Sequence, residues 1–190
     1  MEDQPDSISW RWTENGQYTA NSAYKIQFQG TLTKRDMSAV WKAKAQPKCK
    51  TFAWIMLQHK ILTADNLAKR GWTHDQSCHL CDQEHETSTH LCKDCVFTRE
   101  VWHHLSGWLH ISNLPPFERF RSPYGWWRAA LRKIDKLLRY QFSGLVLVFW
   151  WNIWKERNAR VFRATSKTAF EVAGSIKEDV VRFSIALSRL

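Results

Sequence analysis

The sequence lacks any apolar run long enough to cross a bilayer. The longest, residues 142–154 (FSGLVLVFWWNIW), has 13 residues, whereas a transmembrane helix needs about 20. This run is typical of a buried helix instead. The first residues, MEDQPDS, are acidic and polar, and they lack the features of a secretory signal or a transit peptide. We therefore expect an intracellular protein, in the nucleus or the cytoplasm, that experiences a reducing environment.

Signatures of catalysis are missing as well. The sequence contains no glycine-rich phosphate loop, no nucleophile elbow and no HExxH motif. No small-molecule substrate is indicated either. We predict that the chain is not an enzyme.

Acidic residues are the minority among the charged ones, with 18 Asp and Glu against 28 Lys and Arg, so the net charge is +10. The excess is uneven along the chain. Residues 34–70 carry nine basic and two acidic groups, whereas residues 71–98 carry one basic and five acidic groups. A basic surface attracts polyanions, nucleic acid first among them, although it can also serve solubility alone.

Cysteine is rare but clustered, because four of the five cysteines lie in residues 77–95, SCHLCDQEHETSTHLCKDC. Two CxxC pairs this close together, in a chain without an export signal, indicate a metal site and not disulfides. Cys78 and Cys81 supply the first two ligands. The other two ligands of the site can be Cys92 and Cys95, which gives a four-cysteine site, or His90 and Cys95, which gives a Cys3His site. Spacing alone barely separates these two alternatives.

Either ligand set would fill a tetrahedral zinc ion completely. A closed site has no open position for a catalytic water, so the expected cofactor is a structural Zn²⁺. Such an ion contributes on the order of ten kcal/mol of folding free energy in small domains. The surrounding acidic residues argue against phosphate binding at this loop. The metal is therefore expected to act as a staple.

The pattern of the whole chain predicts a mainly α fold, with a small N-terminal β-hairpin, a zinc-stapled helical middle and a C-terminal helical bundle. In the hairpin, residues 9–20, a two-residue turn would put Trp12 opposite Thr19, whereas a three-residue loop with a left-handed Gly16 pairs Trp12 with Tyr18, which we favour. Pro47 is placed for the start of a helix. The C-terminal helices are expected at about 124–140, 143–162 and 166–188. The predicted divisions are 1–40 for the hairpin and a short helix, 41–111 for the zinc-binding domain, 112–125 for a linker that holds three of the five prolines, and 126–190 for the helical region.

Several of these segments together resemble a known family. The residues concerned are Trp41, Pro47-Lys48, Phe52-Ala53-Trp54, the run ILTADNL at 61–67, Arg70-Gly71-Trp72, then Cys78-x-Leu80-Cys81, His90-Leu91, Cys95 and Val101-Trp102. They are similar to the reverse-transcriptase zinc-binding domain, found at the C-terminal end of the polyproteins of plant LINE-type (non-LTR) retrotransposons. SWRWTENGQYTANSAYK resembles the usual entry segment of this domain, and WNIWKERNARVF (151–162) its usual tail.

The resemblance implies a ligand set of Cys78, Cys81, His90 and Cys95. Cys92 then occupies a position where the family usually has a large apolar residue. The resemblance also implies that a polymerase and an endonuclease lie upstream in the parent elements. This chain has no YxDD-like aspartate pair, so we expect the accessory domain to stand alone.

Two groups of basic residues are candidates for contact with nucleic acid. Lys42, Lys44, Lys48 and Lys50 crowd the start of the predicted helix at 47–59, where the helix dipole disfavours cations unless a phosphate shares the site. Arg128, Arg132, Lys136 and Arg139 recur at the spacing of one helix face. We predict non-specific, salt-dependent binding of an RNA or DNA backbone. The alternative for both groups is a solvated helix face.

An alternative function is a protein-interaction module or exapted regulator. The sequence has twelve tryptophans, and its C-terminal third includes Trp126, Trp127, Trp150, Trp151 and Trp154. If the helices cannot bury all of them, the exposed indoles would anchor a protein partner. Aromatic residues at helical spacing more often belong to a core. Residues 155–162 (KERNARVF) allow a Glu156–Arg160 pair and packing of Phe162 at the helix end, without a further chemical role.

Overall fold

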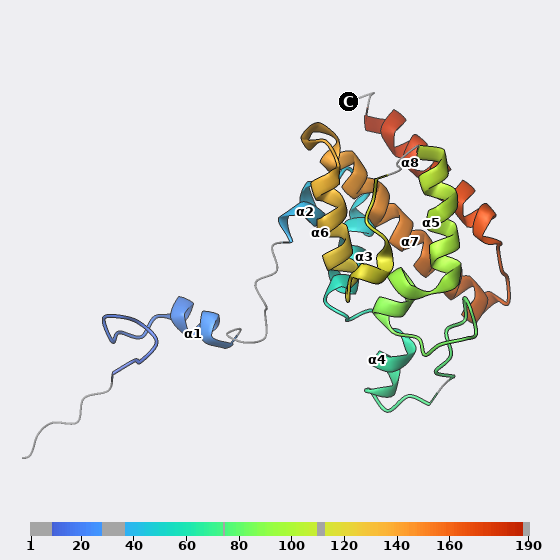
Figure 1. The fold of residues 1–190 in the computed structure, drawn as a ribbon. Helices are drawn as coiled ribbons and strands as arrows, with labels where there is room; N and C mark the ends of the chain where they lie inside the picture. The colour runs from blue at the N-terminus through green and yellow to red at the C-terminus, as the bar shows by residue number, and fades with distance from the viewer. Residues whose placement is uncertain (1–8, 28–36, 74, 110–112, 188–190) are drawn as a thin grey trace, which may run out of the picture. The chain divides into compact units, whose positions relative to one another are not determined.

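The computed structural model describes residues 9–27, 37–73, 75–109 and 113–187. The chain divides into two compact units, residues 1–36 and residues 37–190. Both are drawn in Figure 1. Among the described residues no helix is long and apolar enough to cross a membrane.

The predicted β-hairpin in the first unit is wrong, because the described residues 9–27 contain no strand. Gly16 is left-handed (φ 68°), as expected, and its carbonyl accepts the Trp10 amide at 2.7 Å. The Thr13 hydroxyl then donates to the Gln17 carbonyl, and the Asn15 side chain accepts the Gln17 amide. These local side-chain bonds take the backbone groups that a strand ladder would have used. The turn leads into α1 (Ala20–Gln27).

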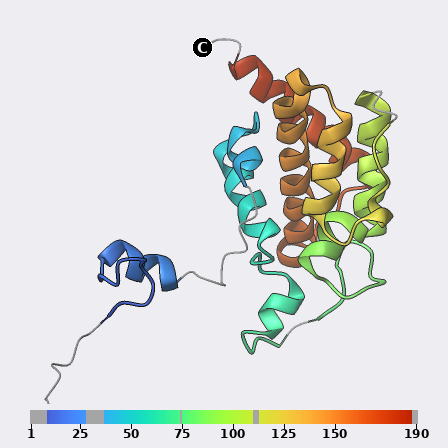
Figure 2. The same ribbon diagram turned by 60° about the vertical axis from the view of Figure 1, so that its left-hand side comes forward.

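The second unit is helical, and α7 (Arg139–Arg163) is the longest helix in its described part. Four further helices contact α7 or its neighbours: α3 (Pro47–Leu57), α5 (Val96–Leu109), α6 (Pro123–Lys133) and α8 (Ala169–Leu187). Figures 1 and 2 show α7 running through the middle of this unit. The short helices are α2 (Ser38–Lys42), which packs on α7, and α4 (Ala64–Ala68). Pro47 is the first residue of α3, as predicted.

A close backbone approach fixes α2 and α3 against α7. The Lys44 amide donates to the Tyr140 carbonyl at 2.9 Å. A Cβ atom at Gly144, on the buried side of α7, would lie 2.0 Å from the Lys44 carbonyl oxygen. Only glycine lets the two segments come this close.

The predicted helix at 124–140 is wrong in extent. Its sequence favours helix throughout, but α6 ends at Lys133 and Ile134 is extended (φ −92°, ψ 139°). Asp135 then accepts the Leu137 amide and starts the 3₁₀ turn η3 (Lys136–Leu138), from which α7 begins. Side-chain capping and the packing of two separate helices outweigh local propensity at this point.

The tryptophans of the C-terminal third form much of the core. Trp126, Trp127 and Trp150 are fully buried, and the Trp126 ring lies 5.0 Å from that of Trp102 on α5. Phe117, in the 3₁₀ turn η2 (Phe117–Arg119), stacks on Trp126 at 4.3 Å. The segment 112–125, expected to be a linker, therefore contributes to the core of the second unit in its described part.

Candidate metal centre

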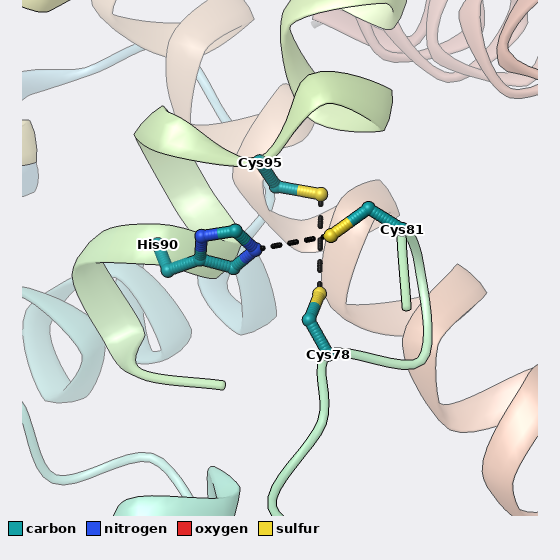
Figure 3. A group of neighbouring side chains, drawn as sticks. All are labelled: Cys78, Cys81, His90 and Cys95. Atoms are coloured by element: carbon teal, nitrogen blue, oxygen red, sulfur yellow. Dashed lines mark hydrogen bonds between the residues drawn. The ribbon is translucent and has the colours of Figure 1, made fainter. Parts of the chain in front are cut away.

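The structure brings Cys78, Cys81, His90 and Cys95 together as one group. Their ligand atoms all lie within 4.8 Å of one another. The Sγ atoms of Cys78 and Cys95 are 3.9 Å apart, and Cys81 Sγ is 3.4 Å from Nε2 of His90 (Figure 3). Zinc bonds of about 2.3 Å to sulfur and 2.0 Å to nitrogen give tetrahedral edges of about 3.8 and 3.5 Å. The four residues therefore fit a zinc ion.

The first two cysteines lie on a tight knuckle. The Cys78 amide donates to the Glu84 carbonyl, and an isolated antiparallel bridge joins Ser77 to His85. The Cys78 carbonyl accepts the amides of Cys81 and Asp82, with Asp82 in the left-handed region (φ 54°). This turn points both thiols to the same side, where a metal can hold them (Figure 3).

His90 and Cys95 are placed by a π-helical turn, η1 (His90–Asp94). The Cys95 amide donates to the His90 carbonyl at 2.8 Å. This bond joins residues five apart in sequence, whereas the bonds of an α-helix join residues four apart. A π turn of this kind is rare and is often found at functional sites. Here it directs the His90 ring and the Cys95 thiol to one centre (Figure 3).

The electrostatics at Cys95 favour the thiolate that a metal requires. A hydrogen bond from the Cys78 thiol lowers the pKa of Cys95 to about 4, and His90 and the Thr98 amide, in the first turn of α5, act in the same direction. The shared proton raises the pKa of Cys78. At neutral pH Cys95 is already a thiolate, so zinc binding releases protons from Cys78 and Cys81, whose pKa values are raised.

Cys92 lies outside this group. Its side chain is fully buried, and its carbonyl accepts the Trp150 indole N–H at 3.2 Å. Burial raises the pKa of the Cys92 thiol. The geometry therefore favours His90 over Cys92 as the fourth ligand, in agreement with the residues that the family resemblance implies.

One side of the group faces solvent. Cys78 and Cys95 are fully buried, whereas Cys81 and His90 line an open hollow of about 350 Å³ together with Thr87. Four protein ligands nevertheless saturate a tetrahedral ion, so this exposure leaves no position for a catalytic water.

A buried ion pair ties the metal loop to α7. Arg157 donates from Nε and Nη2 to the two carboxylate oxygens of Glu86, at 2.9 and 2.7 Å. Glu86 is 1% and Arg157 is 3% exposed. Glu86 Oε1 also accepts the Ala64 amide at the start of α4. The Glu86 carboxylate thus joins three segments.

Arg160, one turn further along α7, holds the knuckle itself. Its Nη1 donates to the carbonyls of His79 and Leu80, which lie between the two knuckle cysteines. Its Nε donates to Glu156 at 2.9 Å, which confirms the predicted pair. The predicted packing of Phe162 is wrong, because Phe162 is 74% exposed at the end of α7.

Residues 155–162 therefore support the metal centre, a role that sequence reasoning missed. The available signal was a glutamate and two arginines that continue a strongly apolar helix. Such side chains are rarely buried unless they are paired.

The comparisons with known proteins agree with this geometry. Residues 18–102 match a family model described as "zinc-binding in reverse transcriptase". Residues 18–102 are thus similar to reverse-transcriptase zinc-binding domains. The chain is also 24% identical over 101 residues to an Arabidopsis thaliana protein named "Putative ribonuclease H protein". The aligned region covers 51% of the chain but 16% of that relative's length. No solved structure gives a significant match.

The matched segment is bonded to a helix outside it, α7. Arg157 and Arg160 lie well beyond residue 102, yet both bond to the loop that carries the candidate ligands. The ligand loop and α7 therefore belong to one structural unit.

The predicted basic residues occupy two neighbouring regions. Lys42, Lys44 and Lys48 are exposed around α2 and the start of α3. Lys50 is partly buried, and its Nζ donates to the Trp41 carbonyl at 2.9 Å. At the start of α3 the Cys49 and Lys50 amides both donate to the Gln46 carbonyl, so neither is free for a phosphate.

The second basic group does not lie on one helix face, since α6 ends before Lys136. The break nevertheless keeps three arginines together. Arg128, Arg132 and Arg139 line one small hollow of about 170 Å³ together with Ala39 of α2. Lys136 is exposed in the turn η3.

Proposed function

We propose that this chain is a non-catalytic, retrotransposon-derived zinc-binding module that binds the backbone of RNA or DNA. Zinc is held by Cys78, Cys81, His90 and Cys95, and its role is structural. The ion closes the loop that Glu86 and Arg157 attach to α7. The nucleic acid binds away from the zinc, on the lysines and arginines around α2.

The observation that carries this proposal is the meeting of the two basic groups. The Lys44 amide bonds to the Tyr140 carbonyl, directly beside Arg139. Ala39, three residues before Lys42, shares a hollow with Arg128 and Arg132. Two groups that are about ninety residues apart in sequence are thus adjacent in space. We call the surface formed by Lys42, Lys44, Lys48, Arg128, Arg132, Lys136 and Arg139 the basic surface.

Backbone recognition gives binding that depends on charge and not on base sequence. Lysines and arginines on phosphates release condensed counterions, so affinity falls steeply as salt rises. The alternative is a protein anchor built from the C-terminal tryptophans. It is less favoured, because Trp126, Trp127 and Trp150 are buried, and the partly buried Trp151 and Trp154 pack against Phe52.

The test is equilibrium binding of the zinc-loaded chain to RNA and DNA over a salt series. The charge-reversal variant Lys42→Glu/Lys44→Glu should lose most of the affinity, and its salt slope should fall by about 1.5, the value for two phosphate contacts. The matched control, Arg70→Glu/Arg163→Glu, makes the same change of net charge on exposed residues outside this surface. Equal losses in both variants, or no binding at low salt, would refute the proposal.

A further inference from the structure

Two tryptophans beside the basic surface remain exposed although the helices that carry them are packed. Trp41 on α2 is 50% exposed and Trp54 on α3 is 39% exposed. Their ring centroids are 6.4 Å apart, with the planes tilted by 45°. Large apolar patches left open on a folded unit commonly mark a binding surface.

The two indoles are held by the backbone around them and not by burial. Lys50 Nζ donates to the Trp41 carbonyl, so the start of α3 is fixed to the end of α2. Lys50 and Trp54 are four residues apart on α3, so they share one face of that helix. Lys50 therefore lies on the same face of α3 as Trp54 and contacts the backbone of Trp41.

The sequence segment that carries this pair has charged residues of one sign. Residues 37–64 contain five lysines and no aspartate or glutamate. An apolar side chain of a protein partner would satisfy the indoles but not the lysines. A nucleic-acid strand offers both a flat aromatic face on each base and a phosphate beside it.

We propose that Trp41 and Trp54 stack on unpaired bases, so that this surface prefers single-stranded RNA or DNA. The inference rests on the proposed function and adds the class of nucleic acid. In a duplex the base faces are stacked on each other and cannot reach an indole, whereas an unpaired base can. Lys42 and Lys44 contact the phosphates, and the indoles contact the bases.

The experiment compares three ligands of equal phosphate number with the zinc-loaded full chain. They are a single-stranded oligonucleotide, the same strand with abasic sites, and a duplex of half that length. The stacking energies measured for bases on aromatic side chains correspond to about a tenfold or greater preference for the intact single strand. Trp41→Ala and Trp54→Ala should each remove about tenfold in affinity for that strand and leave abasic and duplex binding unchanged.

Two controls separate stacking from loss of structure. Trp54→Tyr keeps an aromatic face and should restore most of the preference. Trp72→Ala removes another exposed indole, 67% exposed after α4, and should change nothing. Circular dichroism and zinc content of each variant identify any that fail to fold.

The outcomes distinguish this inference from the proposed function. Equal affinity for all three ligands, unchanged by the tryptophan variants, would overturn the stacking inference and leave backbone binding intact. Absence of binding to every nucleic acid at low salt, together with binding to poly-glutamate, would overturn both and indicate an acidic protein partner.

Discussion

Arg157 and Glu86, 71 residues apart in sequence, form a bidentate ion pair with both side chains almost completely buried. The pair joins the loop that carries the candidate zinc ligands to the central helix α7. Breaking such a pair leaves one buried charge without a partner, which is costly.

We therefore expect Arg157→Met to lower the free energy of unfolding of the zinc-loaded protein by about 3–5 kcal/mol. The change can be measured by urea denaturation. Arg182→Met is the matched control, because Arg182 and Glu178 form an exposed pair on α8. That variant should change stability by less than about 1 kcal/mol. Equal effects of the two variants would contradict the structural role of Arg157.

Arg160 should affect metal binding as well as stability, since it also pairs with the buried Glu156. Its guanidinium holds the carbonyls of His79 and Leu80, which orient the knuckle. Loss of a group that positions metal ligands typically weakens metal affinity by about 10–100-fold. We expect this for Arg160→Ala in competition with a chromophoric zinc chelator. Arg163→Ala, an exposed arginine at the end of the same helix, should leave zinc affinity unchanged.

Two glycine-to-alanine substitutions should change stability in opposite directions. Gly144→Ala places a Cβ 2.0 Å from the Lys44 carbonyl oxygen, so it must push α2 and α3 away from α7. We expect a loss of stability of more than about 2 kcal/mol, in the range of overpacked cores. Gly174→Ala on α8 meets nothing within 4 Å and should stabilise the protein by about 0.5–1 kcal/mol. Thermal denaturation of both variants checks the pair, and a stabilising Gly144→Ala would show that the close approach is absent in solution.

Thiol reactivity should report the state of the metal. Burial raises the pKa of Cys49 to about 11, and a raised pKa keeps the thiol protonated and unreactive at pH 8. Cys92 is fully buried. In the zinc-loaded protein we expect no cysteine to react quickly with a disulfide reagent, and removal of zinc by a chelator should expose the three ligand thiols first. A thiol that reacts within minutes before chelation, and that maps to Cys49 or Cys92, would contradict this arrangement.

Local chemistry explains what could be predicted from the sequence. The CxxC spacing and the nearby His90 gave a short list of ligands, because a zinc knuckle is built within a few residues. Pro47 indicated the start of α3, since a proline at that position loses no hydrogen bond.

Features that depend on distant parts of the chain could not be predicted in this way. Residues 128–139 favour helix locally, yet the helix breaks at Ile134 so that α6 and α7 can pack as separate elements. The turn at residues 10–18 has the glycine of a hairpin, but beyond its Trp10–Gly16 backbone bond the side chains of Thr13 and Asn15 take the backbone groups of Gln17. The Glu86–Arg157 pair joins residues whose proximity no local pattern reveals.

The most direct test of this account is zinc X-ray absorption on the purified protein. Ligation by Cys78, Cys81, His90 and Cys95 predicts three sulfur neighbours at about 2.3 Å and one nitrogen at about 2.0 Å, unchanged in Cys92→Ala. Four sulfur neighbours, with one lost in Cys92→Ala, would contradict the assignment and replace His90 by Cys92.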